Sequence, residues 1–188
     1  MKIVGISGSN VGSKTRTAMD YTLQIAREKY PDADITLLDL AEYEMVFSDG
    51  RDYREYEGDT KVVTETIMAA DAIIIGTPVF QASIPATLKN IFDLLPVNAF
   101  RDKVVSMLVT AGTAKHYLMV EQQLKPILAY MKAHIVPTYV FIEEKDFYRK
   151  EIINDDVIFR MERLVEDTVL LVDAYVKIRA AKDAEYDF

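Results

Sequence analysis

The stretch "DAIIIGTP", residues 71–78, decides the fold of this chain. Its apolar residues follow one another without polar alternation, which is typical of a strand buried on both faces. "KIVGIS" (residues 2–7) and "KVVSMLVTAG" (residues 103–112) have the same form, and each ends in a loop of small residues. "DITLLDL" (residues 34–40) and "IVPTYVFIE" (residues 135–143) are predicted as two more strands. Such strands are typical of parallel sheets covered by helices on both faces.

Segments with a helical apolar pattern separate these strands. Ser83 is predicted to cap one helix that has Pro85 in its first turn, and Asn154 to cap a long final helix. Pro126 lies inside another predicted helix and is expected to kink it. The predicted helices cover residues 15–30, 61–70, 83–95, 115–133 and a segment that starts at Asn154. Residues 41–60, dense in Asp, Glu and Tyr, are predicted to form a long loop.

Strand and helix alternate five times, which predicts a doubly wound α/β fold with a parallel sheet. Five strands favour the flavodoxin-like order 2-1-3-4-5 over a six-stranded dinucleotide domain. No linker or repeat interrupts the chain, so residues 1–188 are expected to form a single domain.

Composition restricts the possible functions. The net charge of −8 argues against nucleic acid or an anionic membrane surface as the main partner. With no cysteine, thiolate chemistry and iron–sulfur clusters are excluded, and His116 and His134 are too few and too far apart to indicate a metal site. No stretch resembles a signal peptide or a membrane span, so a soluble cytoplasmic protein is expected.

Three loops are expected to form the ligand site, because ligands of open parallel sheets bind outside the carboxyl ends of the strands. The first, "SGSNVGSKTRT" (residues 7–17), narrowly misses both the triphosphate loop and the dinucleotide fingerprint. Its hydroxyls and a helix N-terminus suit a phosphomonoester, with Lys14 or Arg16 balancing the charge. No acidic residue ends the third or fourth strand to hold the Mg²⁺ of a triphosphate. A plain turn with a helix cap is the alternative.

The other two loops are "TPVFQAS" (residues 77–83) and "TAGTAKH" (residues 110–116). Phe80 is placed to lie against a flat ring, although a single Phe is more often part of a core. Gly112 allows a flat ligand to touch the backbone. His116 is interpreted as a polar residue at a helix start rather than an acid or base.

At these loops the sequence resembles the NAD(P)H-dependent FMN reductases, which are flavodoxin-like enzymes. "GTPVFQASIPATLKNIFDLLP" (residues 76–96) is similar to the most specific motif of that family. "LVTAGTAKHYLMVEQQLKPILAYMKA" (residues 108–133) is most similar to the reductases that supply reduced flavin to two-component monooxygenases. The resemblance spans most of residues 1–142. The Arg that commonly follows Gly-Ser in the first loop is absent here, so Lys14 or Arg16 is expected to supply the positive charge.

The resemblance implies FMN as the flavin and NADPH or NADH as co-substrate, with no catalytic side chain because the flavin carries the chemistry. Residues that hold the FMN phosphate would be Ser7, Ser9, Lys14, Thr15, Arg16 and Thr17. Those bordering the ribityl chain and the ring would be Pro78, Val79, Phe80, Gln81 and Ser83, with Thr110, Ala111, Gly112 and Thr113 against the ring edge.

The implied activity is hydride transfer from the nicotinamide to FMN and onward to a second acceptor, such as free flavin or a quinone. A homo-oligomer, dimer or tetramer, and a flavin-dependent monooxygenase are the implied partners. A quinone or azo-compound reductase with tightly bound FMN and a non-catalytic flavodoxin-type electron carrier are the alternatives. A phosphate-loop kinase is a remote third reading.

Overall fold

A computed structural model describes residues 1–185; the last three residues of the predicted 1–188 domain lie outside the described part. The central sheet is parallel, in the order β2-β1-β3-β4-β5, and a further short strand, β6, also pairs with β4. This confirms the predicted flavodoxin-like fold. The strands are β1 (Lys2–Ser7), β2 (Asp34–Asp39), β3 (Ala72–Pro78), β4 (Val104–Ala111), β5 (His134–Ile135) and β6 (Val140–Glu143).

The central strands are buried on both faces, as their unbroken apolar runs predict. In β3, Ile73 and Ile75 join one hydrophobic cluster while Ile74 joins the other, and all three are inaccessible to solvent. Successive side chains of a strand point to opposite faces, so an unbroken apolar run supplies two cores at once.

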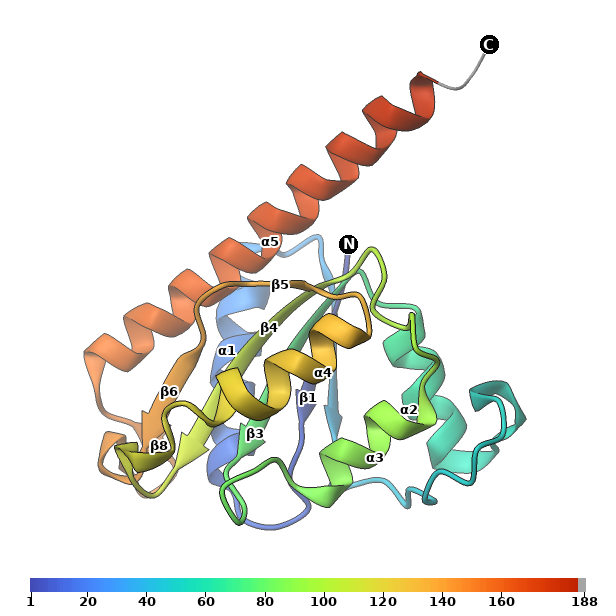
Figure 1. The fold of residues 1–188 in the computed structure, drawn as a ribbon. Coiled ribbons are helices and arrows are strands. Elements are labelled where there is room, and N and C mark those ends of the chain that lie inside the picture. Colours follow the sequence, from blue (N-terminus) through green and yellow to red (C-terminus); the bar gives the residue numbers. More distant parts are fainter. Residues whose placement is uncertain (186–188) are drawn as a thin grey trace.

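Helices cover both faces of the sheet (Figure 1). On one face lie α1 (Lys14–Lys29) and the long α5 (Asp155–Ala184), and Asn154 caps α5 by accepting from the Asp156 N–H, as predicted. The other face carries α2 (Gly58–Met68), α3 (Ala86–Leu94) and α4 (Lys125–Tyr130). The last turns of α5 extend beyond the body of the protein (Figure 1). Within residues 1–185, no helix is both long and apolar enough to cross a membrane.

Two predicted elements are interrupted. The fifth strand, predicted over residues 135–143, is divided into β5 and β6, with Pro137 between them. Proline has no N–H to donate to a sheet ladder, which explains the break. The helix predicted over residues 115–133 is a 3₁₀ turn (Ala114–His116), a π-helical segment (Val120–Leu124) and then α4. Pro126 closely follows the π-helical segment within an unbroken helical path from Met119 to Tyr130, so the irregular hydrogen bonding falls where the proline lacks an N–H.

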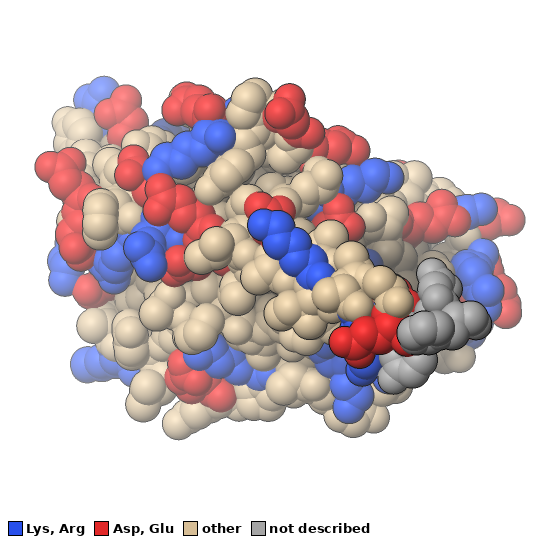
Figure 2. Space-filling view, turned by 90° about the horizontal axis from the view of Figure 1, so that it is seen from above, with Lys and Arg blue, Asp and Glu red and all other residues tan. Residues whose placement is uncertain are grey.

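The connections differ from the predictions mainly after β6. Residues 41–57 form a loop as expected, with one 3₁₀ turn at Tyr53–Glu55, but α2 already starts at Gly58, inside the predicted loop. A two-stranded hairpin of β7 (Phe147–Tyr148) and β8 (Glu151–Ile152) precedes α5 and was not predicted. Charges of both signs are interspersed on the face seen from the top of Figure 1, an arrangement unlike the continuous basic surface that binds nucleic acid (Figure 2).

Candidate flavin site

A cavity of about 380 Å³ lies at the carboxyl edge of the sheet, where all three predicted loops meet. This edge is where open parallel sheets bind their ligands. The predicted site residues in its lining are Lys14, Thr15, Pro78, Val79, Phe80, Thr110, Ala111 and Gly112. Val11, Gly12, Ser13 and Glu144 complete the lining and were not among the predicted site residues.

The first loop is fixed against β3 and α3 by Gly8. The Gly8 N–H donates to the Gly76 carbonyl at 2.8 Å, and the Gly8 carbonyl accepts from the Thr87 hydroxyl at 3.0 Å. A Cβ on Gly8 would stand 2.9 Å from the Gly76 carbonyl oxygen, closer than packed atoms allow. Gly12 has a φ of +80°, which favours glycine. The glycines of the loop thus set its path beneath the cavity.

The N-terminus of α1 opens into this cavity with its capping groups unused. Ser13 is the N-cap residue, but its side chain makes no capping hydrogen bond, and the first turn contains no acidic residue. The first N–H groups of a helix have no partner within the helix and, with the helix dipole, favour an anion. The start of α1 therefore has the donors of an anion site.

Thr15 connects α1 to the third loop. Its hydroxyl lies 2.7 Å from the Thr110 hydroxyl, and both side chains are buried. Thr110 is the next-to-last residue of β4, so this hydrogen bond holds the start of α1 against the end of that strand. Two of the three site loops are coupled in this way.

Lys14 is the cation of the cavity, and its ammonium forms an ion pair with Glu144. Glu144 directly follows β6, which pairs with β4, so its carboxylate reaches the same edge of the sheet. Sequence reasoning missed Glu144, although its place just after a predicted strand was a usable signal.

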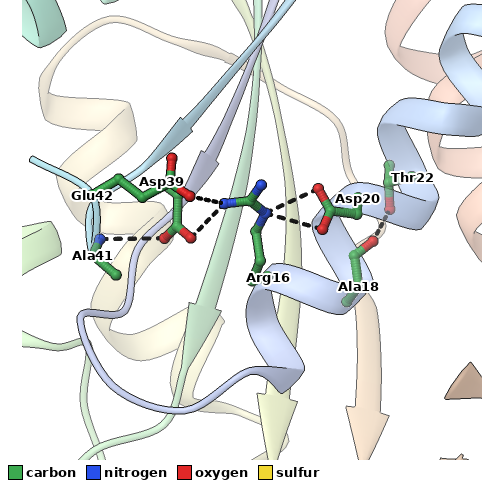
Figure 3. A network of polar contacts seen from close by, with 7 residues as sticks. All are labelled: Arg16, Ala18, Asp20, Thr22, Asp39, Ala41 and Glu42. Carbon is green, nitrogen blue, oxygen red and sulfur yellow. Dashed lines mark hydrogen bonds and ion pairs between the residues drawn. The ribbon is translucent and has the colours of Figure 1, made fainter. Parts of the chain in front are cut away.

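Arg16 points elsewhere, as Figure 3 shows. Its guanidinium donates to Asp39 at 2.6 Å, to Glu42 at 2.9 Å and to Asp20 at 3.0 Å. Hydrogen bonding to Asp39, with further contributions from Glu42 and Asp20, raises the pKa of Arg16 well above its usual value. Arg16 is outside the cavity lining, so its predicted role at the phosphate would require this network to open.

The second loop presents Phe80 through a tight turn. Phe80 and Ser83 exchange both backbone hydrogen bonds, each 2.9 Å long, and the two residues between them, Gln81 and Ala82, have φ values of 49° and 59°. Positive φ at both central positions describes a type I′ turn made without glycine, a strained choice typical of functional sites. Phe80 is 37% exposed, so the alternative of a core position is wrong.

Ser83 belongs to this turn and does not cap α3. The prediction of a Ser83 cap is wrong, because α3 starts at Ala86 after Pro85, and no side chain caps it. The Ser83 hydroxyl instead donates to the Gln123 side chain at 3.3 Å. The backbone pairing with Phe80 keeps Ser83 outside the helix.

The third loop leaves open space at Gly112. A Cβ built on Gly112 would meet no atom within 4 Å, and its φ lies outside the range that favours glycine. Nothing among residues 1–185 therefore requires glycine here, whereas a flat ligand against the backbone would. Thr113 caps the following 3₁₀ turn by accepting from the Lys115 N–H. His116 is in this turn, outside the cavity lining, in line with its interpretation as a polar residue.

The remaining predicted residues lie outside the cavity lining: Ser7, Ser9, Arg16, Thr17, Gln81, Ser83 and Thr113. The Ser9 hydroxyl forms a local turn with the backbone of Val11. Ser7 is buried, and its hydroxyl has no hydrogen-bond partner among the described residues.

A second cavity, of about 400 Å³, lies beside α5 and contains none of the predicted residues. Tyr117, Tyr139, Phe159 and Arg163 are part of its lining. Burial, with the nearby Tyr117, raises the pKa of Tyr139. This second cavity lacks the two features of the first one, which are the open N-terminus of α1 and the end of a central strand.

The donors and the open backbone of the first cavity fit a phosphorylated flat ligand. Free N–H groups and Lys14 suit a phosphate, the Thr15–Thr110 pair offers hydroxyls, and Phe80 and Gly112 leave room for a ring. Sheet order and site together define a flavodoxin-like α/β protein with a cavity at the carboxyl edge of its sheet, into which the uncapped start of α1 opens.

Comparisons with known proteins identify the family. Residues 1–147 match the family described as NADPH-dependent FMN reductase. An NAD(P)H-dependent FAD/FMN reductase of Geobacillus thermodenitrificans is 41% identical over 170 residues, covering 90% of this chain and 92% of its own. The chain therefore belongs to the NADPH-dependent FMN reductase family. These are oxidoreductases that use NAD(P)H and FMN, which confirms the predicted family, enzyme class and cofactors.

A more distant relative and a solved structure are also similar to this chain over most of its length. The NADH-dependent FMN reductase SfnF of Pseudomonas putida is 25% identical, over 98% of this chain and 97% of its own. The structure of the NADH:FMN oxidoreductase EMOB in its apo form superposes with a TM-score of 0.76 at 24% identity, covering 90% of this chain and 88% of that one. This last likeness shows the shared fold.

Proposed function

We propose that this protein reduces FMN with NADPH or NADH in the carboxyl-edge cavity and passes the electrons to a second acceptor. The observation that carries the proposal is the open N-terminus of α1, which faces the same cavity as Lys14, Phe80 and Gly112. Family membership supports the reaction type.

The residues around the cavity divide the work of binding. The N–H groups at the start of α1 and the Lys14 ammonium hold the phosphate. Pro78, Val79 and Phe80 border the ribityl chain and the ring. FMN, when bound, supplies the hydride-accepting and electron-donating chemistry.

The third loop orients the ring and stabilises charge. Ala111 and Gly112, which line the cavity, and the neighbouring Thr113 would lie at the ring edge, where their backbone N–H groups would stabilise negative charge on the reduced flavin. Gly112 lets the ring approach the backbone because no side chain stands between them. This role needs no acid or base side chain.

Free flavin is the proposed acceptor, with a flavin-dependent monooxygenase as the eventual user. A quinone or an azo compound as acceptor, with FMN retained, is the alternative within the same enzyme class. We further propose a cytoplasmic homo-oligomer, a dimer or a tetramer.

The experiment is to purify the protein, record its visible spectrum before and after adding FMN, and follow NADPH and NADH oxidation. Free FMN, a quinone and an azo dye are supplied in turn as acceptors. FMN-dependent nicotinamide oxidation is expected, fastest with free FMN. Flavin that binds but is inert to both nicotinamides would favour the electron carrier, and no flavin binding with no oxidation would exclude the enzyme function.

A further inference from the structure

Glu144 gives the cavity a feature that the family-based prediction does not contain. Of the residues lining the cavity, Lys14 is the one cation and Glu144 the one anion, and the two side chains form an ion pair. Both are partly exposed, at 37% and 64% of the side chain, so the pair can open without disturbing the core.

The backbone that carries Glu144 is held firmly. Glu144 begins a 3₁₀ turn closed by a capping box between Glu143 and Asp146. Asp146 is buried, and its carboxylate accepts from the Glu143 N–H at 2.8 Å and from the Asn154 side chain at 2.7 Å. The turn is thereby tied to the start of α5. The side chain of Glu144 is therefore presented to Lys14 from a fixed position.

No second cation in the cavity lining compensates for the pairing of Lys14. Arg16, the nearest basic residue on α1, is occupied by Asp20, Asp39 and Glu42 (Figure 3). An incoming phosphate and the Glu144 carboxylate are both anions that need the same ammonium group.

We propose that Glu144 competes with the flavin phosphate for Lys14, and that this competition weakens the binding of phosphorylated flavin selectively. The inference rests on the proposed function, in that it takes the phosphate to lie at the start of α1. Glu144 is then a specificity-determining residue: it reduces the advantage of FMN over an uncharged flavin and favours release of FMN. Its effect is electrostatic and local, so it acts on the phosphate and not on the ring.

The test measures dissociation constants for FMN and for riboflavin, which lacks the phosphate, by quenching of flavin fluorescence. The proteins are the wild type, Glu144→Gln and the matched control Glu151→Gln. Glu151 is an exposed glutamate in the neighbouring hairpin, outside the cavity lining, so its substitution changes net charge equally.

Glu144→Gln is expected to lower the Kd for FMN about fivefold at low ionic strength, the scale of one partly exposed charge interaction. The Kd for riboflavin stays unchanged, and Glu151→Gln changes neither. In about 0.5 M salt the gain shrinks, because exposed charges are screened. An unchanged or raised Kd for FMN, or an equal change for both flavins, would overturn the proposal.

The same substitution in a Lys14→Gln protein separates competition for the Lys14 ammonium from simple repulsion between Glu144 and the phosphate. In Lys14→Gln, the gain from adding Glu144→Gln is expected to be smaller than in the wild type, because no ammonium is left to compete for. An equal gain in both backgrounds would contradict competition. Failure of both flavins to bind any of the proteins would instead overturn the proposed function, and this proposal with it.

Discussion

Two cations at the start of α1, Lys14 and Arg16, differ in their place relative to the cavity and in the number of carboxylates around them. Lys14 reaches into the cavity, and Glu144 is the one carboxylate it pairs with among residues 1–185. Arg16 turns away and is shared among Asp20, Asp39 and Glu42. The comparison shows that a position near a helix N-terminus does not by itself bring a basic residue into the cavity. What matters is how many carboxylates the fold has already placed around it.

The largest expected effect separates these two residues directly. Lys14→Met should raise the Kd for FMN about 10- to 100-fold, the loss of one charge-assisted hydrogen bond of about 1.5–3 kcal/mol. Arg16→Met should change it by no more than about threefold, since its charge is already matched by three carboxylates. Titration of both variants with FMN, and with riboflavin as the control, measures this. Equal losses would mean that Arg16 leaves its network to bind the phosphate.

The glycines of the loops give a second contrast, between packing and ligand contact. Gly8→Ala would push a Cβ against the Gly76 carbonyl and should lower the free energy of unfolding by about 1–3 kcal/mol. Gly112→Ala meets no atom and should leave the stability within about 0.5 kcal/mol. The same Gly112 variant should weaken binding of FMN and riboflavin alike. Urea denaturation and flavin titration measure the two effects; a Gly112→Ala protein with unchanged affinities would place the ring elsewhere.

The hydroxyl pair beneath the cavity is the next target. Thr15→Val removes a hydrogen bond of 2.7 Å and leaves the buried Thr110 hydroxyl without this partner. The expected loss in the free energy of unfolding is about 1–2 kcal/mol. The control is Thr17→Val, which makes the same substitution at a position of α1 that lies outside the cavity lining. Urea unfolding that shows no difference between the two variants would argue against a structural coupling of α1 to β4.

The smallest expected effect concerns the Arg16 network itself. Arg16→Met leaves the buried Asp39 carboxylate with the Ala41 N–H and no cation, and should destabilise the protein by about 0.5–1 kcal/mol. Lys14→Met should leave the stability unchanged, since its one ion pair is exposed. Thermal unfolding without flavin compares the two. A larger loss for Lys14→Met would reverse the assignment of the two cations.

Much of the fold was predictable because its signals are local. The unbroken apolar strands such as residues 71–78 require burial on both faces, which leaves few architectures. The breaks were harder to predict. Pro137 and Pro126 were visible, but whether a proline kinks, divides or begins an element depends on which neighbours supply hydrogen bonds. The hairpin before α5 has strands of two residues each, too short for any periodicity.

The candidate site was predictable by loop but not by side-chain direction. Residue types at the ends of three strands predicted Lys14, Thr15, Phe80 and Gly112 as site residues, and all four line the same cavity. The direction of Arg16 depends on Asp39 and Glu42, which reach it only after β2 pairs with β1. Glu144 likewise reaches Lys14 through the pairing of β6 with β4.

The central claim is that the phosphate of FMN binds at the start of α1. The most direct measurement is a titration of ¹⁵N-labelled protein with FMN and, separately, with riboflavin, followed by amide chemical shifts. The account predicts that FMN shifts the amide signals of residues 13–16 strongly, that riboflavin leaves them nearly unchanged, and that both shift Gly112. Shifts confined to the second cavity, around Tyr117 and Arg163, with the start of α1 unaffected, would contradict it.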